Sequence, residues 1–163
     1  MRSDAGPTDS REFISAYISG YVDGEGCFSV SISPRAKLLV GWEVRPSLSV
    51  SQNGDRAEVL ELISDYFQCG SIRPDRSDKT LKWETRRLED LLRRVITHFE
   101  SYPLLSGKRR DFKRFASICK LMAREAHRSR TGLVEIVMLA SEMNPSGRRR
   151  YSPELILART VAR

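Results

Sequence analysis

Two carboxylates alternate with small residues at 18–26, where the sequence reads Ile-Ser-Gly-Tyr-Val-Asp-Gly-Glu-Gly. The pattern predicts a helix whose last turn carries Asp23 and Glu25. A carboxylate at a helix C-terminus faces the negative end of the macrodipole, at a cost of about 0.3–1 kcal/mol. A divalent cation would compensate, and carboxylate oxygens are ligands that Mg2+ favours. The segment therefore predicts a metal ligand at the end of a helix.

The same segment carries a strip of small residues. Gly20 and Gly24 are four positions apart on one helical face, with Ser19 beside them. Small residues at this spacing allow another backbone to approach closely. A second copy of the chain on this strip would bring two copies of Glu25 together, so the expected dimer interface contains Ser19, Gly20, Asp23 and Gly24.

The charge of the chain points to a polyanionic partner. The 163 residues, enough for one domain with a substantial core, include 28 lysines and arginines against 21 aspartates and glutamates, a formal charge of +7. The excess is concentrated between Lys108 and Arg130, and a further cluster occupies 148–150. A concentrated basic surface indicates a polyanion binder, although a solvated helix face gives the same pattern.

Other classes of protein find little support. Cys27, Cys69 and Cys119 are isolated and odd in number, which predicts reduced thiols in the core instead of disulfides or a zinc site. No targeting signal or membrane-spanning run is recognisable, so we expect a cytoplasmic protein of bacterial or organellar origin with no membrane partner. Residues 1–10 are expected to be a flexible leader before a single domain at 11–163.

Apolar periodicity predicts an α+β fold. The expected order is αββαββα, followed by further C-terminal helices, with one four-stranded antiparallel sheet that has helices on one face. The predicted helices cover 11–24, 55–68, 88–99, 112–126 and 131–143, and a short last helix opens at Ser152-Pro153, where an N-cap precedes a proline.

The predicted strands leave one face of the sheet polar. Apolar and polar residues alternate through 27–33 and 42–51, and again through 71–75 and 81–86. Such a ribbon fits the DNA major groove, where Arg and Lys bind guanine, acids bind cytosine and Ser binds either; an ordinary solvated sheet face is the alternative. The candidate DNA-binding residues are Ser29, Ser31, Ser33, Arg35, Glu43, Arg45, Ser47, Ser49, Arg73, Asp75, Lys82, Glu84 and Arg86.

Residues 18–26, followed at once by a strand, resemble the motif of the single-motif LAGLIDADG homing endonucleases. The resemblance continues in Val50-Ser51-Gln52 before the second helix, in the hairpin after Gly70, and in Tyr-Pro-Leu-Leu-Ser-Gly-Lys at 102–108. These blocks occur in the family's order and at its spacing, and the resemblance covers roughly residues 12–144. It implies the family's αββαββα core and site-specific cleavage of double-stranded DNA.

The resemblance also implies roles for single residues. Glu25 matches the family's metal-binding catalytic acid, and Gly26 matches the residue whose backbone carbonyl completes the coordination. Gln52 falls on the polar residue that arranges active-site water. Lys108 falls on the basic residue that faces the scissile phosphate, and Arg56 on another basic residue of the site.

Within the motif, Asp23 matches the family's other acid, which buttresses the end of the helix. Two departures are mild: Ser19 replaces the commonest alanine and Tyr21 replaces a leucine or phenylalanine. Neither change threatens the expected helix-to-helix contact.

Chemistry and symmetry together predict a dimer. Phosphodiester hydrolysis requires a deprotonated water and neutralisation of the pentacovalent charge, which paired divalent ions supply. One Glu25 per chain cannot serve both DNA strands, whereas a C2 homodimer with an isologous interface can. The prediction is a homodimer that uses Mg2+, or another cation such as Mn2+, on a long near-palindromic site, with short 3′ overhangs as the resemblance implies. Lys108 would stabilise charge on the phosphate.

Two other classes of function stay open. One is a non-cleaving nucleic-acid-binding protein on the same scaffold, either a maturase bound to intron RNA or a transcriptional regulator. The other is a basic RNA- or ribosome-associated protein with a coincidental motif, which would show neither metal dependence nor strong sequence preference. The sequence assigns no role to Arg148, Arg149 and Arg150.

Overall fold

The computed structural model describes residues 10–75 and 79–160, so the predicted leader lies almost wholly outside the described residues. The order αββαββα is confirmed, and helices follow it. The elements are α1 (Arg11–Glu25), β1 (Gly26–Pro34), β2 (Trp42–Asn53), the 3-10 turn η1 (Gly54–Arg56), α2 (Glu58–Phe67), β3 (Ser71–Pro74), β4 (Thr80–Thr85), α3 (Leu88–Asp90), the π-helical segment η2 (Leu91–Ile96), α4 (Thr97–Ser101), α5 (Lys108–Ala123), the 3-10 turn η3 (Ala126–Arg128), α6 (Arg130–Ser141) and α7 (Pro153–Arg159).

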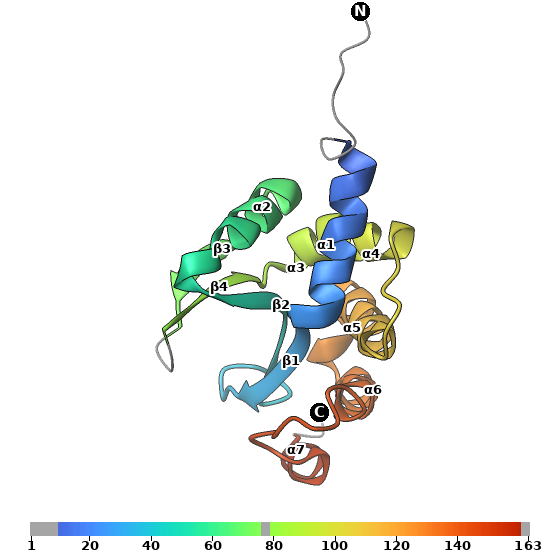
Figure 1. The fold of residues 1–163 in the computed structure, drawn as a ribbon. Coiled ribbons are helices and arrows are strands. Elements are labelled where there is room, and N and C mark those ends of the chain that lie inside the picture. Colours follow the sequence, from blue (N-terminus) through green and yellow to red (C-terminus); the bar gives the residue numbers. More distant parts are fainter. Residues whose placement is uncertain (1–9, 76–78, 161–163) are drawn as a thin grey trace, which may run out of the picture.

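The four strands form one antiparallel sheet in the order β1-β2-β4-β3. Figure 1 shows β1 continuing directly from the end of α1, with α6 and α7 at the opposite end of the molecule from the start of α1. No helix in the two described ranges is long and apolar enough to cross a membrane.

The core forms between the apolar face of the sheet and the helices. Phe28 on β1 lies 5.2–5.5 Å, between ring centroids, from Phe99, Phe112 and Phe115, which come from α4 and α5. On β4, the fully buried Trp83 stacks on Phe67 of α2. The alternation in the sequence therefore identified the buried face of the sheet, because a pleated strand sends successive side chains to opposite sides.

Several local expectations are corrected. The second helix was expected from residue 55, but the 3-10 turn η1 comes first and α2 begins at Glu58. The predicted helix at 88–99 is a continuous run of α3, η2 and α4 with a π-helical centre. Cys27 was expected in the core but is exposed, because its place in the alternation puts it on the polar face; Cys69 is half-buried and Cys119 is buried.

Candidate active site and nucleic-acid interface

Helix α1 joins β1 without a linker, and Gly26 makes this junction. Its backbone N–H donates to the Val22 carbonyl oxygen and closes the last turn. A Cβ at Gly26 would lie 2.6 Å from Val22 Cγ1 and 2.8 Å from Val22 O, so a side chain does not fit without movement of the backbone. The junction therefore holds Glu25 at a defined point between the helix and the first strand.

Glu25 is an exposed carboxylate with no hydrogen-bond or ion-pair partner among residues 10–75 and 79–160. An unpaired anion at the negative end of a helix is unfavourable in isolation and suits a cation ligand. The carboxylate and the neighbouring Gly26 carbonyl supply oxygen donors, which Mg2+ prefers. In the same described ranges no group of three or more His, Cys, Asp or Glu side chains is arranged to hold a metal ion.

Asp23 attaches the loop before α5 to the end of α1. Its carboxylate accepts hydrogen bonds from the backbone N–H groups of Leu105 (3.0 Å) and Ser106 (2.9 Å), and from the Ser106 hydroxyl. Burial alone would raise the pKa of Asp23, but these hydrogen bonds and the charge of Lys108 lower it below its usual value. The Asp23 carboxylate thus contacts its own chain, although the residue was expected at the dimer interface.

Lys108 begins α5 and reaches the same helix end. Its Nζ donates to the Val22 carbonyl oxygen at 3.0 Å, the acceptor that also receives the Gly26 N–H. A cation at a helix C-terminus is stabilising, so this lysine supplies part of the compensation that the two carboxylates of the motif need. Glu25 and Lys108 therefore meet at one helix end, although 83 positions separate them in the chain.

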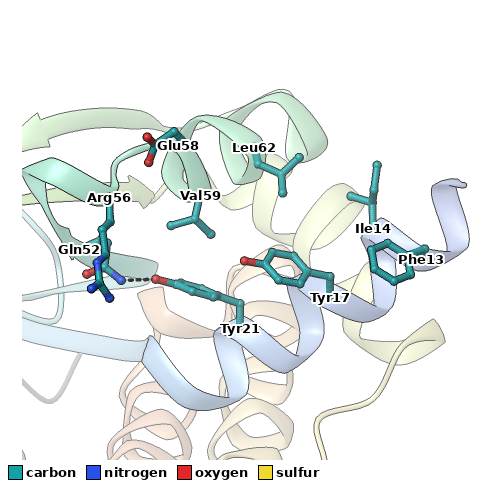
Figure 2. A pocket seen from close by; sticks show the side chains of 9 residues that line it. All are labelled: Phe13, Ile14, Tyr17, Tyr21, Gln52, Arg56, Glu58, Val59 and Leu62. Atoms are coloured by element: carbon teal, nitrogen blue, oxygen red, sulfur yellow. Dashed lines mark hydrogen bonds between the residues drawn. The ribbon is translucent and has the colours of Figure 1, made fainter. Parts of the chain in front are cut away.

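Gln52 and Arg56 lie together on another side of α1. Both line a groove of about 640 Å3 between α1 and α2, and Figure 2 shows them beside the Tyr21 ring. The Gln52 amide donates to the Tyr21 hydroxyl, and Gln52 Oε1 accepts from the Asn53 N–H at 2.9 Å. Tyr21 precedes Glu25 by four residues and shares its helical face. The predicted catalytic residues thus form two groups, which Tyr21 connects along α1.

The candidate DNA-binding residues share the polar face of the sheet. The register places Ser29 opposite Ser47, Ser31 opposite Arg45, and Ser33 opposite Glu43. On the other half of the sheet, Ser49 lies opposite Glu84 and Lys82 lies between Ser51 and Arg73. The remaining three, Arg35, Asp75 and Arg86, lie one residue beyond the ends of their strands.

Carboxylates neutralise much of the charge on this face. Glu43 pairs with Arg35 (3.0 Å) and Arg45 (2.8 Å). Burial would raise the pKa of Glu43, but the hydrogen bonds and charges of the two arginines lower it. Glu84 lies between Arg73 and Arg86, and Lys82 pairs with Asp75 at 3.5 Å.

Two of the predicted base-contacting residues are largely covered by their own chain. Glu84 is 8% exposed beneath its arginines, and Ser47 is 6% exposed with its hydroxyl 2.8 Å from that of Ser29. The other candidates on the face are half-buried or exposed.

A buried histidine on α4, for which the sequence offered no signal, connects α1 to α2 and to the loop before α5. His98 of α4 contacts Ser19 Oγ through Nε2 (3.0 Å) and Tyr66 Oη through Nδ1 (2.8 Å). The Ser19 hydroxyl donates to the Tyr102 carbonyl at 2.7 Å, which fixes the start of the loop that Asp23 also holds. Burial lowers the pKa of His98 to about 4.

Ser19 belongs to the predicted dimer interface, which stays a prediction. Within the chain Ser19 is 6% exposed, and its hydroxyl is bonded to His98 and to the Tyr102 carbonyl. Gly20 and Gly24 are exposed, and a Cβ on either would meet nothing within 4 Å. Phe13 and Tyr17 continue this exposed strip along α1, at 48% and 45% exposure. In the sequence, the signal for this longer strip is a pair of large apolar residues, Phe13 and Tyr17, at helical spacing before the glycines of the motif.

The fold and the site define a family. The family model described as LAGLIDADG endonuclease matches residues 18–119, and the chain belongs to this family. Homing endonuclease I-ApeII of Aeropyrum pernix is 30% identical over 150 residues, which cover 88% of each chain. The archaeal intron-encoded homing endonuclease I-Vdi141I, solved in complex with DNA, has a TM-score of 0.85 at 27% identity, over 92% of this chain and 96% of that chain.

Some relatives are much longer. Probable intron-encoded endonuclease 3 of Neurospora crassa is 32% identical over 127 residues, which are 77% of this chain and 24% of that protein. The chain thus spans about a quarter of the length of this relative. Together the comparisons confirm the family and the fold class that the motif and its spacing predicted.

Proposed function

We propose that the chain is a homing endonuclease that acts as a homodimer, cuts both strands of a long near-palindromic DNA site with Mg2+ or a similar divalent cation, and leaves short 3′ overhangs. One observation carries the proposal. Glu25 is exposed, has no partner among the described residues, and stands at the end of a helix on which Gly20 and Gly24 form a neighbouring exposed strip. That arrangement supports a site completed by a second copy, since one chain offers one such carboxylate.

The exposed strip of α1 supports the two-fold packing. Phe13, Tyr17, Gly20 and Gly24 recur at helical spacing and are exposed, and the two aromatic residues also line the edge of the groove between α1 and α2. Packing two copies of this strip would bury the two aromatic rings, and the glycines would allow the two helix ends to approach closely. The contact would be isologous, so each Glu25 would lie near one strand of the duplex.

The residues at the helix end suggest a division of labour. Glu25 and the Gly26 carbonyl would hold the divalent ion, which when bound would activate water and neutralise charge on the phosphate. Lys108, held at the same helix end by the Val22 carbonyl, would lie where it stabilises the negative charge of the transition state. Gln52, oriented by Tyr21, has an amide suited to positioning a water, with Arg56 beside it.

The polar face of the sheet would read the DNA bases. Its serines and half-exposed arginines offer donors and acceptors of the kinds that pair with base edges in the major groove. The arginines bound to Glu43 and Glu84 are already oriented by these carboxylates. The resulting rigidity favours sequence-specific contacts over loose attraction to phosphates.

The test is cleavage of a library of candidate targets in linear plasmids, with Mg2+ or with EDTA, by the wild type and by Glu25→Gln. We expect Glu25→Gln to keep DNA binding and dimerisation and to lose cleavage by at least 100-fold. Glu12→Gln is the matched control, because Glu12 is an exposed glutamate at the other end of the same helix.

Two results would overturn the proposal. The first is a Glu25→Gln variant that cuts like the wild type. The second is a wild type that binds DNA or an intron RNA but cuts nothing with Mg2+ or Mn2+, which would favour the non-cleaving alternative on the same scaffold.

A further inference from the structure

A groove of about 740 Å3 runs along β1, the outermost strand of the sheet on this side. One wall is β1 itself, with Ser29, Ser31 and Ser33 of the polar face among its lining residues. The opposite wall is the segment 146–151 that links α6 to α7. The groove is therefore continuous with the proposed DNA-reading surface and extends it past the edge of the sheet.

The linking segment is docked firmly on the rest of the fold. The Asn144 side chain donates from Nδ2 to the Phe28 carbonyl on β1 at 2.8 Å. Its backbone N–H donates to Asp111 Oδ1 at 3.3 Å, and a turn follows in which the Gly147 N–H donates to the Asn144 carbonyl. Beyond the segment, Ile156 of α7 is 4% exposed and returns the chain to the core. The segment thus has a defined place beside the sheet.

Three consecutive arginines lie on this wall. Arg148, Arg149 and Arg150 all line the groove, and none has an acidic partner in the part of the chain that the structure describes. The Arg149 guanidinium donates to the Met143 carbonyl at 3.1 Å, and that of Arg150 lies 5.6 Å from the centre of the Tyr151 ring. The side chains of Arg149 and Arg150 are thus held beside the groove, and neither pairs with a carboxylate of the described residues.

The sheet face differs in its charge. Its arginines and Lys82 are bound to Glu43, Glu84 and Asp75. A carboxylate that already pairs with an arginine offsets part of the attraction of that arginine for phosphate. The groove adjoining the polar face therefore carries three arginines that form no ion pair with any residue in the described ranges.

We infer that this groove is a clamp for the phosphate backbone of double-stranded DNA, in which Arg148 and Arg150 bind phosphates and the β1 serines lie alongside; the inference rests on the proposed function. Guanidinium groups bind phosphate through paired hydrogen bonds, which suits them to this position. The clamp adds affinity without reading sequence, because phosphates are the same at every base pair. It gives the arginine cluster a role separate from base recognition.

The experiment measures binding to a labelled 30-base-pair duplex of mixed sequence at several salt concentrations, in EDTA so that no cleavage occurs. Each lost phosphate contact lowers the slope of log K against log salt by about 0.9. Because the proposed homodimer carries two copies of each arginine, we expect R148S/R150S to lower this slope by about 3.6 and to weaken binding at 0.1 M salt by more than about 100-fold. R148S alone, at an exposed position, should lower the slope by about half as much.

The control R124S/R130S removes the same charge from two exposed arginines that lie outside the groove. We expect this control to lower the slope by less than half as much as R148S/R150S, and R148K/R150K to retain most of the wild-type slope. The inference is overturned if R148S/R150S, or R148S where the double variant does not fold, keeps the wild-type slope and affinity within twofold. It is also overturned if these variants lose binding to an RNA duplex but not to DNA. Absence of cleavage by a wild type that still shows the salt effect would count against the endonuclease proposal alone.

Discussion

Replacement of Gly20 by alanine should have opposite effects on the stability of the isolated chain and on the stability of the proposed dimer. In the isolated chain a Cβ at Gly20 would contact nothing within 4 Å. Glycine in a helix interior is about 0.8–1 kcal/mol less favourable than alanine. Gly20→Ala should therefore stabilise the monomer by about 1 kcal/mol, which raises Tm by about 2–4 °C for a chain of this size.

In the proposed dimer the same methyl group lies where two helices approach most closely. An additional methyl in a packed contact costs about 1–3 kcal/mol. The two-fold axis doubles this cost, because each chain contributes one methyl. The dimer should therefore be destabilised by about 2–6 kcal/mol, which raises the dissociation constant by roughly 30-fold to more than 10,000-fold.

Sedimentation velocity over a range of protein concentrations measures the dimer dissociation constant, and thermal unfolding at concentrations well below that constant measures the monomer. Gly54→Ala is the matched control, since Gly54 lies in η1 outside the strip and a Cβ there also meets nothing within 4 Å. A Gly20→Ala dimer that dissociates with the wild-type constant, within twofold, would refute the packing of two α1 strips. A lower monomer Tm would refute the reasoning about open space.

Other substitutions test the contacts that shape the site. Asp23→Asn should reduce the free energy of unfolding by about 1–2 kcal/mol at pH 7. The pKa of Asp23 in the folded chain lies below 3.8, so the difference between variant and wild type should persist above that pH and vanish as the pH falls through the folded pKa. Urea denaturation at pH 7 and at pH 3 would measure it. The pKa of His98, lowered by burial from 6.5 to about 4, means that the unfolded chain binds the proton first, so stability should fall by up to about 3 kcal/mol from pH 6.5 to pH 4. His98→Gln should flatten that part of the stability profile, and an unchanged profile would contradict the assignment. Gly26→Ala should cost about 1–3 kcal/mol, since its Cβ would lie 2.8 Å from Val22 O, and an unchanged Tm in thermal unfolding would show that the junction relaxes freely.

Features that depend on local periodicity could be predicted from the sequence. The alternation in β1 and β2 identified which residues face the core, because the side-chain period of a strand is two. The helix at the motif ends at Glu25, one residue from the predicted end, since the glycines and the strand pattern that follows allow no continuation. Ser152 caps α7 as predicted, and its hydroxyl accepts from the Leu155 N–H.

Features that depend on distant partners could not be predicted. Ser19 is next to an exposed glycine in the chain, but its burial is decided by His98 and Tyr102, about 80 positions away in the sequence. The attachment of Lys108 to Val22 O has the same origin, because a loop that Asp23 holds delivers α5 to the end of α1. The motif indicated which residues matter, and the fold of the chain decided which way each side chain points.

In the proposed endonuclease, the direct junction of α1 and β1 would couple DNA cutting to base recognition through covalent geometry. Ser29 lies three residues beyond Gly26 along an extended strand, about 10 Å at roughly 3.3 Å per residue, close to the span of three stacked base pairs at about 3.4 Å each. No loop separates Glu25 from β1, so movement of a loop cannot compensate for a misplaced strand. A duplex that slips by one step against the strand would move the scissile linkage away from the acid by the same step, so a misread sequence and a misplaced cut become one mechanical event.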